Sequence, residues 1–133
     1  MTDPQKILWS GRWGTNYTYW IHSIGTTFEK APANYIYATI GTKGWIAPYI
    51  GKTGDISQRT LDTHHKRDCI VRNGVTHIHV HKSSNDEEER QKEEADLVAK
   101  WNPPCNDRWR SVIWIQGGAR PARRFQDGAQ RVS

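Results

Sequence analysis

The sequence contains two cysteines and one methionine among its 133 residues, and it has no long run of apolar side chains. Two cysteines exclude a four-cysteine zinc site. A membrane-spanning helix needs about 20 consecutive apolar residues, and no segment supplies them. The first residues, MTDPQKILWSGRWG, also lack the basic and then apolar stretches of a secretory signal. We therefore expect a cytoplasmic protein in which Cys69 and Cys105 are not disulfide-bonded and serve as packing residues.

The apolar content is low, at 35% of residues, but it includes 7 Trp and 5 Tyr. Because each large aromatic side chain can bury much apolar area, this composition predicts a globular protein with an aromatic-rich core. The length suits one domain. A formal net charge of +5 favours a polyanionic partner such as nucleic acid, and moderate basicity by itself is weak support for that partner.

The chain divides into three predicted segments. Residues 1–32 form an aromatic-rich N-terminal extension, with a strand expected at residues 17–24. Residues 33–107 form the core, and residues 108–133 form a basic, partly mobile tail with a short strand expected in the run WRSVIWI. The arginines of the tail are Arg108, Arg110, Arg120, Arg123, Arg124 and Arg131.

The core has the element order β-β-α-β-α. The runs YIYATI and APYIGKT, separated by GTKG, predict a hairpin. Asp55 followed by Gln58 resembles a capping box and predicts a helix over residues 56–66. The run THIHVH predicts a strand with Ile78 and Val80 on one face and three histidines on the other. Ser84 or Asn85 is expected to cap a helix over residues 86–101, which ends at Asn102-Pro103-Pro104.

One carboxylate of the last predicted helix lies on its apolar face. Glu94, Leu97, Val98 and Trp101 are spaced at i, i+3, i+4 and i+7, and most other acids of the helix point elsewhere. Burying a carboxylate costs several kcal/mol unless it is paired or holds a cation. The spacing therefore predicts either a bound cation at Glu94 or a salt bridge to a nearby Arg or Lys.

Two tyrosines of the predicted hairpin share one face. A turn centred near Lys43 places Tyr37 opposite Tyr49, with Lys52 and Arg59 following after Gly51. Nearby positive charge stabilises phenolate, as a general base requires, and an arginine fork binds two phosphate oxygens at once. These residues are candidate catalytic groups. The mid-strand position of Tyr37 slightly favours its hydroxyl as the more important of the two.

These residues carry a resemblance to a known family. Tyr35-Ile36-Tyr37, followed after eleven residues by Tyr49-Ile50-Gly51, resembles the two-part signature of the GIY-YIG nuclease superfamily, with Tyr35 replacing the usual first glycine. Arg59 stands eight residues after Gly51, where the family has its catalytic arginine. The block EADLVAKWNPPCN is similar to the family's metal-binding helix and its closing Pro-x-x-Asn. The resemblance spans residues 34–106.

The resemblance implies a small three-stranded antiparallel sheet flanked by helices, an α+β fold. It also implies a divalent-metal-dependent endonuclease that hydrolyses DNA phosphodiesters, with Mg²⁺ or Mn²⁺ anchored by Glu94 and no small-molecule cofactor. Tyr37 or Tyr49 would help activate the attacking water, and Arg59 would stabilise charge growing on the phosphate. The remaining candidates are Lys52 as a further catalytic group, and Tyr35, Asn106 and Arg108 as substrate-binding residues. Asn106 also suits a structural role at the turn after Pro104.

The sequence departs from the family at one position. The family usually has a His or Tyr one helical turn after the arginine, where this chain has Thr63. An inserted residue would make His64 the proton relay, with His65 as the alternative. In an undistorted helix each further residue rotates the side chain by about 100°, which would remove His64 from the site.

Two other functions remain open at this point. A non-catalytic DNA- or RNA-binding module could use the same groove without cutting. A metalloprotein could bind zinc or iron through His77, His79 and His81, which are spaced at i, i+2 and i+4 on one strand face. Alternating polar residues are also typical of any half-exposed strand. No zinc finger or helix-turn-helix pattern identifies the target of a nuclease.

Overall fold

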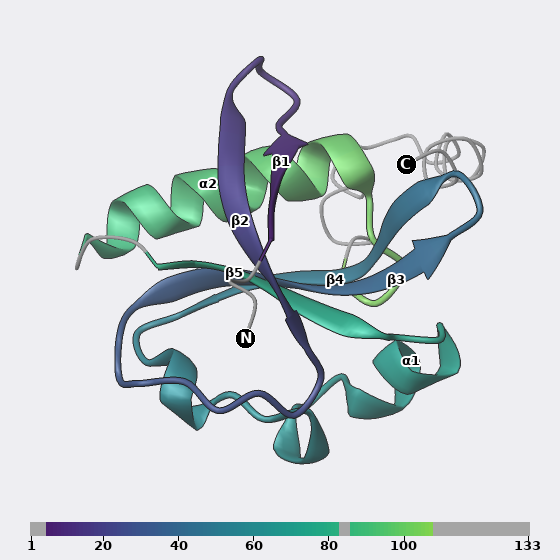
Figure 1. The fold of residues 1–133 in the computed structure, drawn as a ribbon. Coiled ribbons are helices and arrows are strands. Elements are labelled where there is room, and N and C mark those ends of the chain that lie inside the picture. Colours follow the sequence, from purple (N-terminus) through teal and green to yellow (C-terminus); the bar gives the residue numbers. More distant parts are fainter. Residues whose placement is uncertain (1–4, 83–85, 108–133) are drawn as a thin grey trace.

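A five-stranded antiparallel sheet forms the centre of the computed structural model, which describes residues 5–82 and 86–107. The sheet is curled, and its strand order is β1-β2-β5-β3-β4 (Figure 1). Its strands are β1 (Lys6–Ser10), β2 (Asn16–Ser23), β3 (Ala33–Gly41), β4 (Gly44–Thr53) and β5 (His77–Lys82). The predicted tail strand and Arg108 lie outside the described residues.

The expected three-stranded sheet is wrong, because the N-terminal residues supply two more strands. β2 pairs with β5 from Trp20 opposite Val80 to Ser23 opposite His77, and β1 then pairs with β2. A strand that alternates aromatic and polar residues is well suited to cover an open sheet edge, and here β2 covers the free edge of β5. The fold is therefore predominantly β, rather than a small sheet flanked by helices.

One long helix and one short helix accompany the sheet. They are α2 (Glu87–Trp101) and α1 (Arg67–Arg72). The bounds of α2 agree with the prediction, but its cap is the Asp86 side chain, which accepts a hydrogen bond from the Glu88 backbone N–H at 3.0 Å. α2 lies on one side of the sheet and α1 on the other (Figure 1).

The helix predicted over residues 56–66 does not form. Two single 3-10 turns, η1 (Ile56–Gln58) and η2 (Leu61–Thr63), stand there instead. Asp55 does cap the first turn, through bonds from the backbone and hydroxyl of Ser57, but Arg59 and Thr60 then adopt extended backbone. Hydroxyl and carboxylate side chains offer the backbone local bonds that compete with a continuous helix, and this segment is rich in them.

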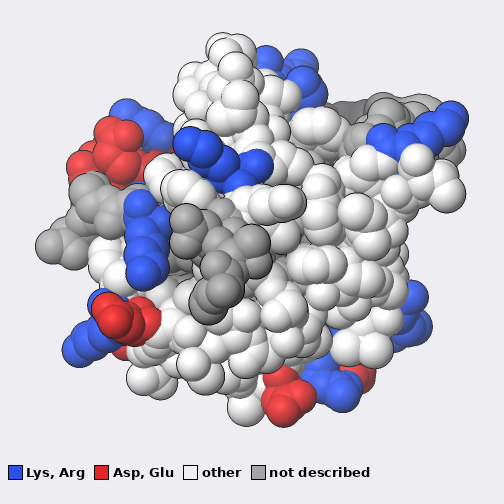
Figure 2. All heavy atoms as spheres, viewed as in Figure 1, with Lys and Arg blue, Asp and Glu red and all other residues white. Residues whose placement is uncertain are grey.

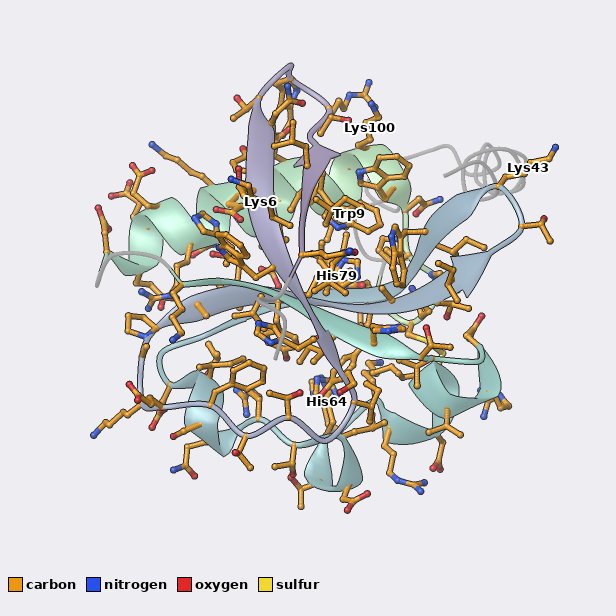
Figure 3. All side chains as sticks on the ribbon, viewed as in Figure 1. Lys6, Trp9, Lys43, His64, His79 and Lys100 are labelled. Atoms are coloured by element: carbon orange, nitrogen blue, oxygen red, sulfur yellow. A yellow bond between two sulfur atoms is a disulfide. The ribbon has the colours of Figure 1, made fainter. Side chains whose placement is uncertain are left out.

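Each face of the sheet has its own apolar cluster. The α1 side buries three tyrosines of β3 and β4 together with Ile78 and Val80 of β5. The α2 side buries Trp9, Ile50 and Leu97. This confirms the predicted division of β5, with its isoleucine and valine on one face and its histidines on the other. Figure 3 shows the division directly, with Trp9 and His79 on one side of the sheet and His64 on the other.

Two further acids of α2 hold this helix against the sheet. The Tyr17 hydroxyl donates to Asp96 at 2.6 Å, and the Tyr19 hydroxyl donates to Glu93 at 2.6 Å. Glu93 also contacts His81 Nδ1 at 2.8 Å. These bonds satisfy both buried carboxylates, so the N-terminal strands fix the position of the helix that carries Glu94.

The expectation of unbonded cysteines is wrong as well. Cys69 of α1 and Cys105 form a disulfide with a Cα–Cα distance of 5.8 Å. Sequence separation gave no indication of this contact, because the return of the chain after α2 brings Cys105 beside α1. The bond links the segment after His64 to the loop that runs along β4.

Within residues 5–82 and 86–107, no helix combines the length and apolar character needed to cross a membrane.

Candidate functional site

Three tyrosines and a histidine form a compact aromatic cluster on the α1 side of the sheet. Tyr37 is paired with Tyr49 across β3 and β4, as predicted, and Tyr35 is paired with Gly51. The His64 ring packs at a centroid distance of 4.8 Å from Tyr49 and 5.5 Å from Tyr37. All four side chains are buried, with Tyr49 the most exposed of the tyrosines at 9%.

His64 reaches this cluster because the segment around it is not helical. It follows η2 in extended backbone, with φ −71° and ψ 137°, so the rotation expected in a helix does not apply. His65 stacks on its outer side at 4.6 Å and is exposed. Of the two candidate histidines, the structure places His64 against all three tyrosines.

Hydrogen bonds define a direction through the cluster. The Lys66 backbone N–H donates to His64 Nδ1 at 3.0 Å, so in neutral imidazole the proton is on Nε2. Nε2 then donates to the Tyr35 hydroxyl oxygen, 3.0 Å away. Tyr35 in turn hydrogen-bonds to the Tyr49 hydroxyl. The series of hydrogen bonds therefore runs from His64 through Tyr35 to Tyr49, whose hydroxyl oxygen accepts the last one.

Tyr35 was predicted only as a substrate-binding residue. Its hydroxyl instead lies inside the cluster, between His64 and Tyr49, and its side chain is 2% exposed. The resemblance could not reveal this role, since the family usually has glycine at that position. The one signal in the sequence was a third phenol at i−2 from Tyr37 on the same strand face.

The rings of Tyr35 and Tyr49 pack over Gly51. A Cβ atom added there would lie 2.7 Å from Tyr35 Cζ, 2.8 Å from Tyr35 Oη and 2.8 Å from Tyr49 Cε2. Such distances are too short for carbon contacts, so no other residue fits without moving the rings. The glycine of the Tyr-Ile-Gly run therefore has a steric purpose.

Burial keeps the phenols protonated in the free protein. It raises the pKa of Tyr37 to about 12, although Arg59 acts in the opposite direction. Burial also raises the pKa of Tyr49, and the Glu94 carboxylate adds to this, while the Tyr35 hydrogen bond and Arg59 lower it. Arg59 acts in the direction expected of a nearby positive charge, but desolvation is the larger effect, so the pKa of both phenols is raised rather than lowered.

His64 is neutral at physiological pH. Burial, together with the nearby charges of His65, Arg59 and Lys66, lowers its pKa to about 4. In its neutral form the ring can accept at Nδ1 and donate at Nε2, as the hydrogen bonds described above require.

Glu94 and Arg59 flank the cluster with opposite charges. Both influence the pKa of Tyr49, which Glu94 raises and Arg59 lowers, and Arg59 also lines one pocket with Tyr37. Burial raises the pKa of the Glu94 carboxyl, with Lys52 acting against it. Within the described residues, neither side chain forms a salt bridge or side-chain hydrogen bond. The salt bridge considered for Glu94 as an alternative to a bound cation is thus not found there.

Lys52 and Asn106 bind other parts of the protein. Lys52 Nζ lies 2.9 Å from Glu87 Oε2 in an ion pair at the start of α2. The Asn106 carboxamide accepts from the Ile50 backbone N–H at 3.0 Å and donates to the Ile50 carbonyl at 2.8 Å. Asn106 therefore braces the outer edge of β4 next to Tyr49, and its position is structural.

The three histidines of β5 do not converge on one point. His79 is buried and its Nδ1 accepts from Trp9 Nε1 at 3.0 Å, whereas His81 contacts Glu93. No group of three His, Cys, Asp or Glu side chains that could hold a metal occurs in the described part of the chain. The proposed zinc or iron triad is not supported. A magnesium site with one protein carboxylate is a different case, because Mg²⁺ retains much of its hydration.

Charge of both signs is spread over the face of the molecule that is drawn in Figure 2. Figure 2 shows Lys and Arg next to Asp and Glu around the margin of one face, with mostly uncharged side chains between them. The excess of arginine that makes the chain basic lies in residues 108–133.

Comparison of the chain with protein-family models, with curated proteins and with solved structures gave no match.

Proposed function

We propose that the protein is a divalent-metal-dependent endonuclease of the GIY-YIG type that hydrolyses DNA phosphodiester bonds. The observation that carries the proposal concerns Glu94 and Arg59: both charges act on the pKa of Tyr49, neither has an ion pair among the described residues, and Arg59 lines one pocket with Tyr37. A half-buried carboxylate and a free guanidinium around a phenol cluster are complementary to a cation and a phosphodiester.

In this proposal each side chain has one task. Arg59 binds the phosphate oxygens and stabilises the negative charge that grows on them. Glu94 would hold the Mg²⁺ or Mn²⁺ ion, and its single carboxylate and partial burial fit such an ion. When bound, the ion would supply positive charge to neutralise the phosphate. Lys52 forms an ion pair with Glu87, and its positive charge acts to lower the pKa of the Glu94 carboxyl.

In its phenolate form, with its own proton released to solvent, Tyr49 orients the attacking water and accepts a proton from it. Tyr49 accepts a hydrogen bond from Tyr35, which itself accepts one from His64. The bond from Tyr35 favours the deprotonated form of Tyr49. Among the residues that the structure describes, Tyr37 has no such bond, and we assign it to positioning the phosphate beside Arg59. His64 keeps the Tyr35 hydroxyl directed toward Tyr49 and need not exchange a proton itself.

A cytoplasmic place of action belongs to the same proposal. Reducing compartments keep most thiols unbonded, so the Cys69–Cys105 disulfide is unusual for such a location. A measurement of the redox state of these two residues in extracts prepared with a thiol-blocking reagent would test the location. A fully bonded pair would indicate an oxidising compartment.

The function is tested with Glu94→Gln. We expect the parental protein to nick supercoiled plasmid with Mg²⁺ or Mn²⁺ and to stop with a chelator, and Glu94→Gln to lose at least about 100-fold in rate. Glu89→Gln is the matched control, because Glu89 is an exposed acid on the same helix. Plasmid binding without cleavage by the parental protein, over a range of DNA structures and both metals, would support the non-catalytic binding module instead.

A further inference from the structure

A pocket of about 390 Å³ opens next to the proposed catalytic residues Tyr37 and Arg59. Its size falls within the range of sites that bind small organic groups. Much of its wall comes from residues 24–28, between β2 and β3. That segment lies outside the residues that resemble the nuclease family, so the pocket is a property of this chain.

The walls of the pocket are of two kinds. The apolar part is made by Ile24, Phe28, Ile56 and Ile78, and it continues into the buried cluster below the sheet. Phe28 is held edge-on against His22, with ring centroids 5.0 Å apart, so its position is fixed from the other side. This part of the pocket suits an apolar group.

Polar groups stand around the same opening. The Thr27 hydroxyl offers a donor and an acceptor, the Asp62 carboxylate offers acceptors, and the hydroxyl oxygens of Thr26 and Ser57, which already donate to the Ser23 carbonyl and to Asp55, can still accept. Arg59 also lines the pocket, and within the described residues its guanidinium has no ion pair. An apolar slot with hydrogen-bonding groups and one free cation at its side is complementary to a ring that carries a phosphate nearby.

We propose that this pocket receives one unstacked nucleobase of the nucleic-acid strand whose phosphodiester is bound at Arg59. The inference rests on the proposed function, because it takes Arg59 as the phosphate-binding residue. A nucleobase has flat apolar faces and a polar edge, which match the two kinds of wall. Its sugar spans the distance between base and phosphate, so one nucleotide can occupy the pocket and contact Arg59 together. The protein would thus act on a strand with an accessible base, such as a single-stranded, mismatched or branched site.

The test is a nuclear magnetic resonance titration of the isotope-labelled full chain without metal. The probes are dCMP, 2-deoxyribose 5-phosphate and inorganic phosphate. We expect all three to shift the signal of Arg59 and only dCMP to shift the amides of Thr26, Thr27 and Phe28. Equal shifts with dCMP and with the base-free sugar phosphate would overturn the assignment of the pocket to a nucleobase. The absence of any shift at these amides would do the same.

A blocked variant checks the location of the base. Thr27 is exposed at the pocket, and Thr27→Trp should fill it and abolish the base-dependent shifts. Thr42→Trp is the control, since Thr42 is exposed in the β3–β4 turn away from the pocket, and it should leave the shifts unchanged. Base-dependent shifts that persist in a folded Thr27→Trp protein would contradict the assignment.

A last measurement distinguishes a nucleic-acid strand from a free mononucleotide as the ligand that supplies the base. A DNA trinucleotide of sequence TCT should bind at least about tenfold more tightly than dCMP, because the strand adds phosphate contacts. Equal affinity would assign the pocket to free mononucleotides and overturn the proposal. These measurements need no cleavage, so a protein that cuts plasmid but shows no base-dependent shift refutes the pocket alone. Base-dependent shifts in a protein that never cuts would refute only the nuclease.

Discussion

Tyr37 and Tyr49 face each other across β3 and β4 because the hairpin contains an irregularity. Gly41 pairs with Gly44 at the turn, and the same register would continue to place Tyr37 opposite Pro48. The register shifts by one residue between Thr39 and Tyr37. A one-residue shift moves side chains to the other face of the sheet, so the irregularity brings both phenols to the site.

The first prediction concerns the glycine beneath the rings. Gly51→Ala should destabilise the protein by about 1–3 kcal/mol, because the new methyl group would overlap Tyr35 and Tyr49. Urea denaturation measures the loss. Gly54→Ala is the control, since nothing lies within 4 Å of a Cβ atom there and it should be nearly neutral. Equal stability of the two variants would mean that the rings are not packed over Gly51 as described.

The second prediction concerns the disulfide. Cys69 and Cys105 are 36 positions apart, and closing a loop of that size stabilises a protein by about 4 kcal/mol in the chain-entropy model. Reduction should therefore lower the melting temperature of the parental protein by many degrees. The Cys69→Ser, Cys105→Ser double variant should melt near the reduced parent and not respond to reductant. A parental melting temperature that reductant does not change would show that the bond contributes little.

The third prediction follows from His79. Burial lowers the pKa of its ring to about 3, below the ordinary value of 6.5 in an unfolded chain. As the pH falls below 6.5 the unfolded state binds a proton that the folded state refuses, so stability decreases progressively until about pH 3. His79→Gln should reduce this loss, because glutamine does not titrate and can still accept from Trp9. The check is urea denaturation at several values between pH 7 and pH 4. Parallel curves for parent and variant would exclude His79 as a source of acid sensitivity.

Sequence patterns predicted the parts of the fold where one interaction dominates. The YIYATI and APYIGKT runs gave the hairpin, the alternation in THIHVH gave the faces of β5, and the apolar spacing gave α2. The turn centred near Lys43 gave the correct tyrosine pair, although the actual cause is the register shift. That shift depends on packing and has no local signal.

Long-range contacts explain the errors. β1 and β2 join the sheet through the edge of β5, some 60 residues later, and no pattern within residues 6–23 identifies that partner. The capping signal at Asp55 was real, but it began a 3-10 turn, since Thr60 and His64 adopt extended backbone. The same departure from helix is what brings His64 to Tyr35. Rules based on the local sequence therefore failed in the segment that brings His64 into the candidate site.

The last prediction distinguishes the three tyrosines. Phe retains the ring and its packing, so each Tyr→Phe variant reports on the hydroxyl alone. Tyr49→Phe should lower single-turnover cleavage by at least about 100-fold and remove the rising limb of the pH profile, as expected for loss of the general base. Tyr37→Phe should be slower than the parent with the same pH dependence. This order reverses the slight preference for Tyr37 that its mid-strand position suggests, because the hydrogen bond from Tyr35 ends at Tyr49.

Tyr35→Phe gives the sharpest readout, because Tyr35 does not touch the substrate in this scheme. The hydrogen bond from Tyr35 lowers the pKa of Tyr49, so its loss raises that pKa and should move the rising limb of the profile to higher pH. The rate at saturating pH should recover most of the parental value, which a merely misfolded variant could not do. An unchanged limb in Tyr35→Phe, together with a larger loss in Tyr37→Phe than in Tyr49→Phe, would make Tyr37 the base and leave the Tyr35 bond without a catalytic effect.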